Sequence, residues 1–305
     1  MIELDSITKN LLKQIAGLHK IPDGAVSFRR NGKGEIIRST AHIEIKKKED
    51  NPGINIYVHS SCQNEACHIP VVVTNDGIFD LVYNDFYIED GAKVTIVAGC
   101  GVHSGSSSGH NGIHTFHIGK NAEVTYIENH LALGEGKGKI LNPTTIVNMK
   151  EGSTMTMNTT QIGGVDFANR KATANLKENA LLTINEKILT ASNNIAKTDF
   201  KVNLLGQNSR CKIVSRSVAR DKSKQVFKSN MIGKNLCFGH VECDGIVLDN
   251  ANIDSIPRVS ARDNQASLSH EASIGKIASE QLVKLMTLGL SEKQAESKII
   301  EGFLK

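Results

Sequence analysis

Alternating apolar and polar residues occur in short runs from about residue 21 to residue 265, and Gly, Asn and Asp separate the runs. This alternation is typical of β-strands with one buried face. Five of the runs share the pattern small, any, apolar, Thr or Lys, apolar, and their central apolar residues recur in steps of 27 to 31 residues. These central residues are Val94, Val124, Met155, Leu182 and Cys211.

A single run of this kind cannot bury its apolar face alone, so the repeat predicts that successive copies stack on one another. No strong helical pattern lies between the copies, which argues against a doubly wound α/β sheet. The sequence therefore predicts an all-β core over residues 21–265 with the architecture of a parallel β-helix. A β-sandwich with chance similarity between its strands is the competing structural interpretation.

Helical patterns flank the predicted β core. Apolar residues recur at helical spacing within residues 1–20, which predicts an N-terminal helix capped by Asp5 or Ser6. From about residue 266 the composition turns helical again: Ser279 can begin one helix, and Ser291 with Gln294 forms the capping box of a second. We expect residues 266–305 to be a helical region that caps the solenoid or binds a partner.

The charge balance excludes some classes of partner. The 36 basic and 32 acidic residues leave a formal charge of +4, so the overall charge points neither to nucleic acid nor to an anionic membrane. The sequence has no apolar run of eighteen residues, and its first residues lack the basic and apolar regions of a signal peptide. We therefore expect a cytoplasmic protein.

The sequence does not match two common enzyme signatures, the P-loop and the nucleophile elbow. A P-loop requires Gly-x-x-x-x-Gly-Lys followed by Ser or Thr, but the nearest stretch, residues 134–140, lacks the hydroxyl and does not open a helix. The Ser- and Gly-rich residues 105–109 do not have the strand-turn-helix context of a nucleophile elbow. We expect the chain to hydrolyse no nucleotide by itself.

A histidine-rich segment follows Cys100 and contains His103, His110, His114 and His117. Imidazoles near a thiol can bind a transition metal. Because His114 and His117 are three residues apart, a strand would send them to opposite faces. Surface or turn histidines explain this segment better than a metal site does.

The late cysteines form a stronger cluster. Cys237 and Cys243 fall where the last turns of the solenoid are expected, and in a reducing cytoplasm they are thiols. His270 and Glu271 follow Cys243 by about one repeat, so one stacked turn would bring them beside it. A thiolate, an imidazole and a carboxylate together predict an iron or sulfur acceptor site. Its candidate ligands are Cys243, His270, Glu271 and Cys237.

The C-terminal region resembles the signature of the SufB/SufD family, the scaffold subunits of the SUF iron–sulfur cluster assembly machinery. The resemblance is most specific there and extends over most of the chain, including the stretch that ends at Cys100 and the stretch from Ser215 to Arg262. The chain is similar to the short archaeal and anaerobic-bacterial form that is encoded with one ATPase. The signature residues are Ser269–Ile277, Glu280-Gln281-Leu282, Gly289-Leu290-Ser291 and Ile300–Phe303.

This resemblance implies a right-handed parallel β-helix that acts as a scaffold rather than as an enzyme. It implies a transient iron–sulfur cluster as the cofactor, a SufC-type ABC ATPase as the partner, and apo iron–sulfur proteins as recipients. The sequence does not reveal whether a flavin participates. The residues expected to bind the ATPase are Ile277, Leu282, Leu285 and Met286.

The sequence departs from SufB at two positions. Ser269 stands where SufB has a glutamate, and Ile118 stands where SufB has the cysteine thought to receive sulfur, which leaves Cys100 as the candidate sulfur acceptor. With a SufB-type Cys243 and Glu271 and a SufD-type Ser-His pair, the chain could serve both roles as a homodimer.

Two other functional classes stay open. A metal-free structural adaptor for an ABC ATPase would have the same helical region. A β-helix enzyme acting on carbohydrates would need paired carboxylates or aromatic platforms, and only 4% of the residues are aromatic.

Overall fold

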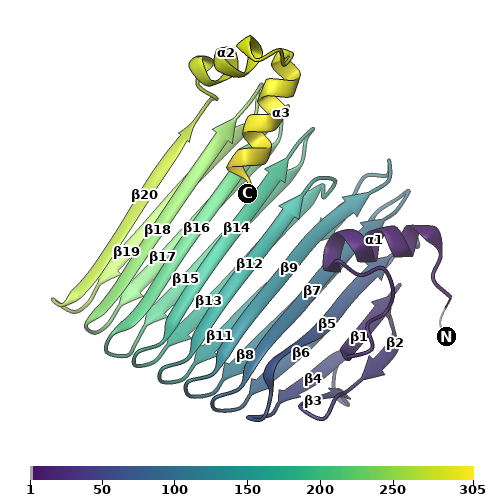
Figure 1. Cartoon of the computed structure of the whole chain (residues 1–305), viewed down its shortest axis with the longest axis vertical. Coiled ribbons are helices and arrows are strands. Elements are labelled where there is room, and N and C mark those ends of the chain that lie inside the picture. The colour runs from purple at the N-terminus through teal and green to yellow at the C-terminus, as the bar shows by residue number, and fades with distance from the viewer. Residues whose placement is uncertain (1–2) are drawn as a thin grey trace.

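Two long β-sheets face each other and make up most of the computed structural model, which describes residues 3–305 (Figure 1). Beyond its first strands the chain passes back and forth between the sheets, so that each new strand pairs with the strand laid down one turn earlier. Pairing is parallel along the stack, and antiparallel pairs occur at its N-terminal end. The parallel β-solenoid predicted from the repeat is therefore confirmed.

The first sheet, called sheet A, contains ten strands in the order β2-β1-β5-β7-β9-β12-β14-β16-β18-β20. Their bounds are β1 Ala25–Arg30, β2 Lys33–Arg38, β5 Gln63–Val73, β7 Lys93–His103, β9 Glu123–Leu133, β12 Thr154–Ile162, β14 Leu181–Thr190, β16 Ser209–Ala219, β18 Cys237–Val247 and β20 Ala266–Gly275.

The second sheet, sheet B, also has ten strands, in the order β19-β17-β15-β13-β10-β8-β6-β4-β3, with β11 continuing the line of β10 between β13 and β8. Their bounds are β3 Ile43–Lys47, β4 Gly53–Val58, β6 Phe79–Ile88, β8 Ser108–Ile118, β10 Lys139–Leu141, β11 Thr144–Met149, β13 Phe167–Leu176, β15 Ile195–Leu204, β17 Lys224–Gly233 and β19 Asn252–Ala261.

The five repeated motifs identified in the sequence are neighbouring strands of sheet A. Their central apolar residues pair one to the next in register, and all five side chains are buried between the sheets. Because side chains alternate across a strand, a fixed register keeps the same positions inward in every turn. The row consists of Val94, Val124, Met155, Leu182 and Cys211.

The turns that lead into these strands of sheet A also stack. One residue in each turn has a left-handed conformation, with φ between 53° and 73°, and its N–H donates to a carbonyl oxygen one turn further along at 2.7–3.0 Å. Gly and Asn adopt this conformation most easily, which explains why they separate the motifs in the sequence. The stacked residues are Gly91, Asn121, Gly152, Asn179 and Asn208.

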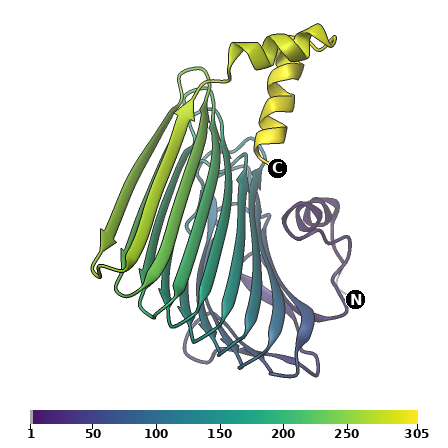
Figure 2. The same ribbon diagram turned by 60° about the vertical axis from the view of Figure 1, so that its left-hand side comes forward.

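Helix α1 (Ser6–Ala16) covers the outer side of sheet A near its N-terminal end (Figure 2). Asp5 is its N-cap and accepts a hydrogen bond from the backbone N–H of Thr8 at 2.7 Å, in agreement with the sequence prediction. The apolar side of the helix buries Leu11 and Ile15, which lie over glycine positions of β7. The missing side chains there let helix and sheet approach closely.

The solenoid continues beyond the boundary expected at residue 265. Residues 266–275 form strand β20, and helices begin only at α2 (Ser279–Thr287) and α3 (Glu292–Phe303). The expectation that residues 266–275 are helical is wrong, because Leu268 and His270 alternate with small polar residues at the period of a strand. The capping box of Ser291 and Gln294 is present at the start of α3.

Helix α3 packs back onto the outer side of sheet A (Figures 1 and 2). Its Ile300 lies in an apolar cluster with Val218, Ile246 and Ile277. Arg216 of β16 donates to the carbonyl oxygen of Phe303 at 3.3 Å.

Within the described residues, no helix is long and apolar enough to cross a membrane.

Replacing Gly99 with alanine should loosen α1. The added methyl carbon would lie 2.6 Å from the carbonyl oxygen and 2.8 Å from the Cβ of Ile15, so the helix has to move away from the sheet. We expect a loss of about 1–3 kcal/mol in the free energy of unfolding, as for other overpacked sites. Hydrogen exchange of residues 6–16 should become faster.

Gly275→Ala is the matched control, because nothing lies within 4 Å of the added carbon. Unchanged exchange of residues 6–16 in Gly99→Ala would contradict the close packing of α1 on β7.

Candidate functional site

A row of buried polar side chains runs along the inside of sheet A. Its members lie on β9, β12, β14, β16 and β18 and pair one to the next in register. Neighbouring strands are about 4.8 Å apart, so the side chains follow one another closely along the solenoid axis. The row consists of Glu128, Thr159, Glu186, Ser215 and Cys243, each at most 2% exposed.

A second row lies two residues further along the same strands. Cys100 of β7 pairs in register with His130 of β9, which pairs with Gln161 of β12. All three side chains face inward and are buried. The interior of the solenoid is therefore polar in its middle turns, although most of its length is apolar.

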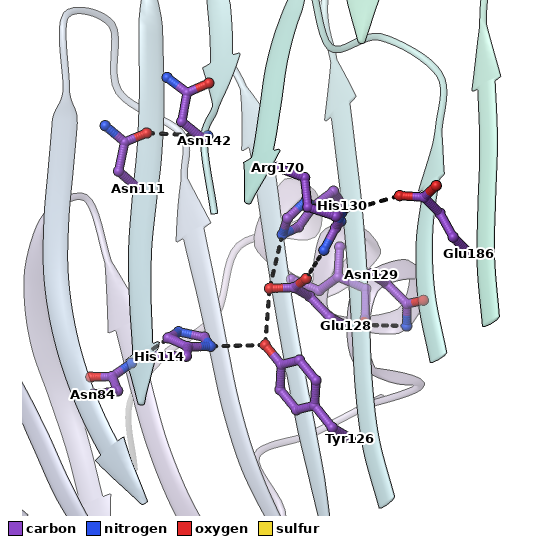
Figure 3. A network of polar contacts seen from close by, with 11 residues as sticks. Asn84, Asn111, His114, Tyr126, Glu128, Asn129, His130, Asn142, Arg170 and Glu186 are labelled. Carbon is purple, nitrogen blue, oxygen red and sulfur yellow. Dashed lines mark hydrogen bonds and ion pairs between the residues drawn. The ribbon is translucent and has the colours of Figure 1, made fainter. Parts of the chain in front are cut away.

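Arg170 of β13 lies between two carboxylates of the first row and neutralises part of their charge (Figure 3). Its guanidinium forms a close ion pair with Glu128, and its Nε is 3.7 Å from the Oε1 of Glu186. Glu186 also accepts hydrogen bonds from Thr198 and Ser215, each at 2.8 Å. The three charged groups are held inside the solenoid with most of their polar atoms paired.

The two carboxylates respond differently to this environment. Burial raises the pKa of Glu128, but the positive charge of Arg170, together with the contributions of His130 and His114, outweighs burial, and the pKa lies well below the usual value. Burial also raises the pKa of Glu186, and there Arg170 and the two hydroxyl donors compensate only in part. One buried cation therefore serves two carboxylates, and it favours the ionised form of Glu128 most strongly.

A chain of hydrogen bonds leads from Glu128 to His114 (Figure 3). The Tyr126 hydroxyl donates to Glu128 at 2.9 Å, so it accepts from His114 Nδ1, which lies 2.8 Å away. His114 Nε2 then accepts from the Asn84 side-chain amide at 3.3 Å. Both ring nitrogens of the neutral imidazole therefore have hydrogen-bond partners, and burial lowers the pKa of His114 to about 4.

Cys100 lies beside this network. It lines an internal cavity of about 20 Å³ together with His110, His114, Glu128 and His130. Burial raises the pKa of the Cys100 thiol well above its usual value, and the carboxylates of Asp80 and Glu128 add to the shift. Cys100 is therefore a neutral thiol in the resting protein.

Cys243 ends the first polar row on β18, next to the last strand of sheet A. Its side chain faces inward and is buried, and Ser215 is its neighbour in register on β16. Burial raises the pKa of its thiol, and the Ser255 hydroxyl partly opposes this shift. One strand, β20, separates Cys243 from the open edge of the sheet (Figure 1).

The other candidate ligands lie at different positions around Cys243. His270 of β20 faces the same interior and is a diagonal neighbour of Cys243. Its Nδ1 is 3.2 Å from the Ser229 hydroxyl, and its Nε2 is buried without a hydrogen-bond partner. Glu271 pairs in register with Glu242 and is exposed on the outer face. Cys237 is buried on the same strand as Cys243, six residues and thus about 20 Å away.

The structure thus brings Cys243 and His270 to one face and keeps Glu271 and Cys237 apart from them. Among residues 3–305, no three His, Cys, Asp or Glu side chains are arranged so that they could hold a metal ion together.

Comparison with known proteins identifies the family. The family profile described as "SUF system FeS cluster assembly, SufBD core domain" matches residues 81–303. An iron–sulfur cluster assembly SufBD family protein of Archaeoglobus fulgidus is 30% identical over 267 residues, which cover 86% of this chain and 71% of the relative. A SufBD family protein of Methanocaldococcus jannaschii is 31% identical over 244 residues, covering 78% and 75%.

The chain belongs to the SufBD family. Membership implies a role in iron–sulfur cluster assembly, as the sequence resemblance indicated. The matched region begins within β6 and contains both polar rows, the open C-terminal edge and the helices α2 and α3.

Helix α2 gives this SufBD protein an exposed apolar surface. Ile277, just before the helix, is buried, and Leu282 and Leu285 are half-buried. Met286 is 42% exposed, and its neighbour Val283 is 57% exposed. The four residues expected to bind a partner therefore divide into two kinds: those that anchor α2 to the body and Met286, which points to solvent.

Sequence reasoning missed the charged interior of the solenoid. His110 and His114 were expected at the surface or in turns, but both are buried on the inner face of β8, while His117 is exposed on the outer face. The expectation was right that His114 and His117 point to opposite faces. The signal that could have identified the buried pair is an even separation, which puts two side chains on the same face of a strand. His110 and His114 are four residues apart on β8, and Glu128 and His130 are two apart on β9.

Lowering the pH should weaken the fold through His114. An unfolded histidine has a pKa near 6.5 and the buried one about 4, so only the unfolded chain gains this proton in between, and stability falls as the pH drops from 6.5 to 4. Between pH 7 and pH 5 the loss from this residue is about 2 kcal/mol. Urea unfolding at pH 7 and at pH 5 measures this loss in the free energy of unfolding. The loss in His114→Gln should be smaller than in the wild type by about 2 kcal/mol.

His117→Gln is the control, because His117 lies on the exposed face of the same strand. An equal loss of stability in wild type and His114→Gln would show that the buried imidazole does not have the environment described.

Proposed function

We propose that this chain is a scaffold subunit on which a nascent iron–sulfur cluster is built at the C-terminal end of the solenoid, for transfer to apo-proteins. The observation that carries the proposal is the position of Cys243, a thiol at the end of a buried polar row and one strand from an open sheet edge. The iron–sulfur cluster is the cargo of the reaction. Membership of the SufBD family supports the same role.

Cys243 and His270 supply the first ligands. A thiolate and an imidazole are donors that iron accepts, and His270 Nε2 has no competing hydrogen bond. The thiol must lose its proton to bind, so cluster assembly should be favoured as the pH rises. A site with few sulfur ligands from the protein would hold a cluster less firmly than four cysteines, which suits a cluster that is handed on.

Cys100 is the proposed acceptor of sulfur. The polar rows support a route from its cavity towards Cys243, because His130, Glu128, Thr159, Glu186 and Ser215 follow one another along the interior. Their hydrogen-bonding groups would solvate a sulfur species that the apolar parts of the solenoid would exclude.

The open C-terminal edge is the proposed junction between two copies of the chain. Strands β19 and β20 end their sheets, and unpaired strand edges readily pair with another chain. Val259 of β19 is 47% exposed there. Glu271 faces away from its own Cys243, so we assign it to the cluster only across this junction, from the second protomer.

A SufC-type ABC ATPase is the proposed partner at α2. The exposed Val283 and Met286 offer an apolar surface beside the C-terminal edge. Movement of α2 on ATP-driven dimerisation of the partner would act on β20 directly, since only residues 276–278 connect the two elements.

A metal-free adaptor is the second candidate function. The absence of a three-ligand group among residues 3–305 favours it, because one protomer alone does not complete a metal site. Anaerobic reconstitution of the full chain, followed by measurement of iron, acid-labile sulfide and visible absorbance, distinguishes the two candidates. A scaffold binds both elements, and an adaptor binds neither.

Cys243→Ala should abolish reconstitution, with iron and acid-labile sulfide falling to the background of untreated protein. The reason is the loss of the proposed thiolate ligand, and circular dichroism should show that the β-sheet content is kept. Cys237→Ala is the matched control, because it removes an equally buried thiol from the same strand. Wild-type iron and sulfide in Cys243→Ala would remove this residue from the mechanism.

Met286→Asp should weaken binding of the SufC-type ATPase. A charge placed at the centre of an apolar interface costs about 2 kcal/mol or more, which corresponds to a dissociation constant roughly 30-fold higher. Isothermal titration calorimetry with the purified ATPase measures it. Ile162→Asp on β12 makes the same kind of change at a side chain of nearly equal exposure, 43% against 42%, and should leave the affinity unchanged. Equal affinities of both variants would exclude α2 as the docking site.

A further inference from the structure

The outer face of sheet B carries a basic surface that the cluster site does not use. It is formed by the outward side chains of β13, β15, β17 and β19, and we call it the basic face. Helices α1 and α3 pack on sheet A, so they leave this face open (Figure 2). Its charged residues are Lys171, Lys197, Lys201, Lys224, Lys228 and Arg258, with Asp199 and Asp254 among them.

The charge of the whole chain is concentrated on this face. Six basic and two acidic side chains leave four positive charges, as many as the formal charge of +4 of the entire chain. All eight side chains are exposed. None of them forms an ion pair with another of residues 3–305. The remainder of the molecule is close to neutral.

The fold holds these charges in a regular pattern. Lys197 and Lys201 lie four residues apart on β15, and Lys224 and Lys228 lie four apart on β17, a separation of about 13 Å in each strand. Asp199 pairs in register with Lys228 and with Lys171, so a negative charge stands between two positive ones. The backbone of the sheet fixes this arrangement before any partner arrives.

Apolar side chains lie among the charges. Ile256 of β19 is 49% exposed and pairs in register with Lys228. Ile195 and Val226 are half-buried on the same face. Apolar contacts surrounded by charged side chains are typical of protein–protein interfaces.

Two features argue for an acidic protein rather than for nucleic acid or a membrane. Among the described residues of these four strands, the outward aromatic ring is Phe167, and the ammonium group of Lys197 covers it at 5.7 Å from the ring centre, so no free ring is left for stacking of bases. Asp199 and Asp254 would repel phosphate groups, whereas they can pair with basic residues scattered on an acidic protein.

We propose that the basic face docks a protein whose contact surface is mainly acidic with a few basic residues. The face is separate from Cys243 and from α2, so docking there leaves both free. The proposal stands on the charge pattern alone and does not depend on cluster assembly.

The test uses fluorescein-labelled poly-L-glutamate of 20 residues as an acidic polypeptide probe, with fluorescence anisotropy on the full-length chain near physiological salt. Lys201→Glu with Lys224→Glu reverses two charges of the basic face and should weaken binding about tenfold or more, equivalent to about 1.4 kcal/mol. The matched control is Arg210→Glu with Lys212→Glu, which makes the same charge change at exposed residues of sheet A and should leave binding within about twofold of wild type.

Carbodiimide cross-linking of the probe supplies a second measurement, since the links to Lys197, Lys201 and Lys228 should outnumber those to Lys212. Equal weakening in both double variants would overturn the proposal, because the overall charge would then explain the binding. The proposal would also be wrong if the Lys201 and Lys224 double variant kept the probe but selectively lost a 20-base-pair DNA duplex or phosphatidylserine vesicles.

Discussion

The fixed register of the parallel stack is the constraint on which the rest of the structure depends. Along the parallel stack each strand pairs in register with the strand one turn earlier, and the left-handed residues in the turns before the strands of sheet A repeat that alignment. A position that faces inward in one turn therefore faces inward in the turns around it. Functional side chains are therefore arranged in rows along the solenoid axis, because the nearest neighbours of an inward side chain are the side chains at the equivalent positions of the adjacent turns.

The polar interior follows from this constraint. One buried carboxylate would be costly, but Glu128 and Glu186 lie on opposite sides of Arg170, and two buried hydroxyl groups donate hydrogen bonds to Glu186. The histidines at the edge of the network are accommodated as neutral donors and acceptors. A network of this kind favours one register, because a shift by one residue would leave its charges without partners.

The sequence was sufficient to predict the solenoid, since the apolar row from Val94 to Cys211 recurs in five successive strands at steps of 27 to 31 residues. It was insufficient for the charged interior. Arg170 and Glu186 interrupt no visible pattern, because a polar residue at an inward position looks the same as one at an outward position displaced by a single residue. Only the three-dimensional register assigns them to the inside.

The same one-residue sensitivity decides the candidate site. The separation of 28 residues between Cys243 and Glu271 was close to the repeat and led to the expectation that they lie side by side. In the structure Cys243 pairs with Ala272, 29 residues later, so Glu271 falls on the outer face while His270 stays inside. The boundary expected at residue 265 is wrong because β20 has only two large apolar residues, Leu268 and Ile274, among small and polar ones, so its strand pattern is weaker than that of earlier strands.

The most direct measurement of the central claim is an iron anomalous difference map from a crystal of the anaerobically reconstituted chain. The account predicts iron bonded to the Sγ of Cys243 at the C-terminal edge of the solenoid, with His270 on the same side. Iron bonded elsewhere in the chain, with none at Cys243, would contradict it.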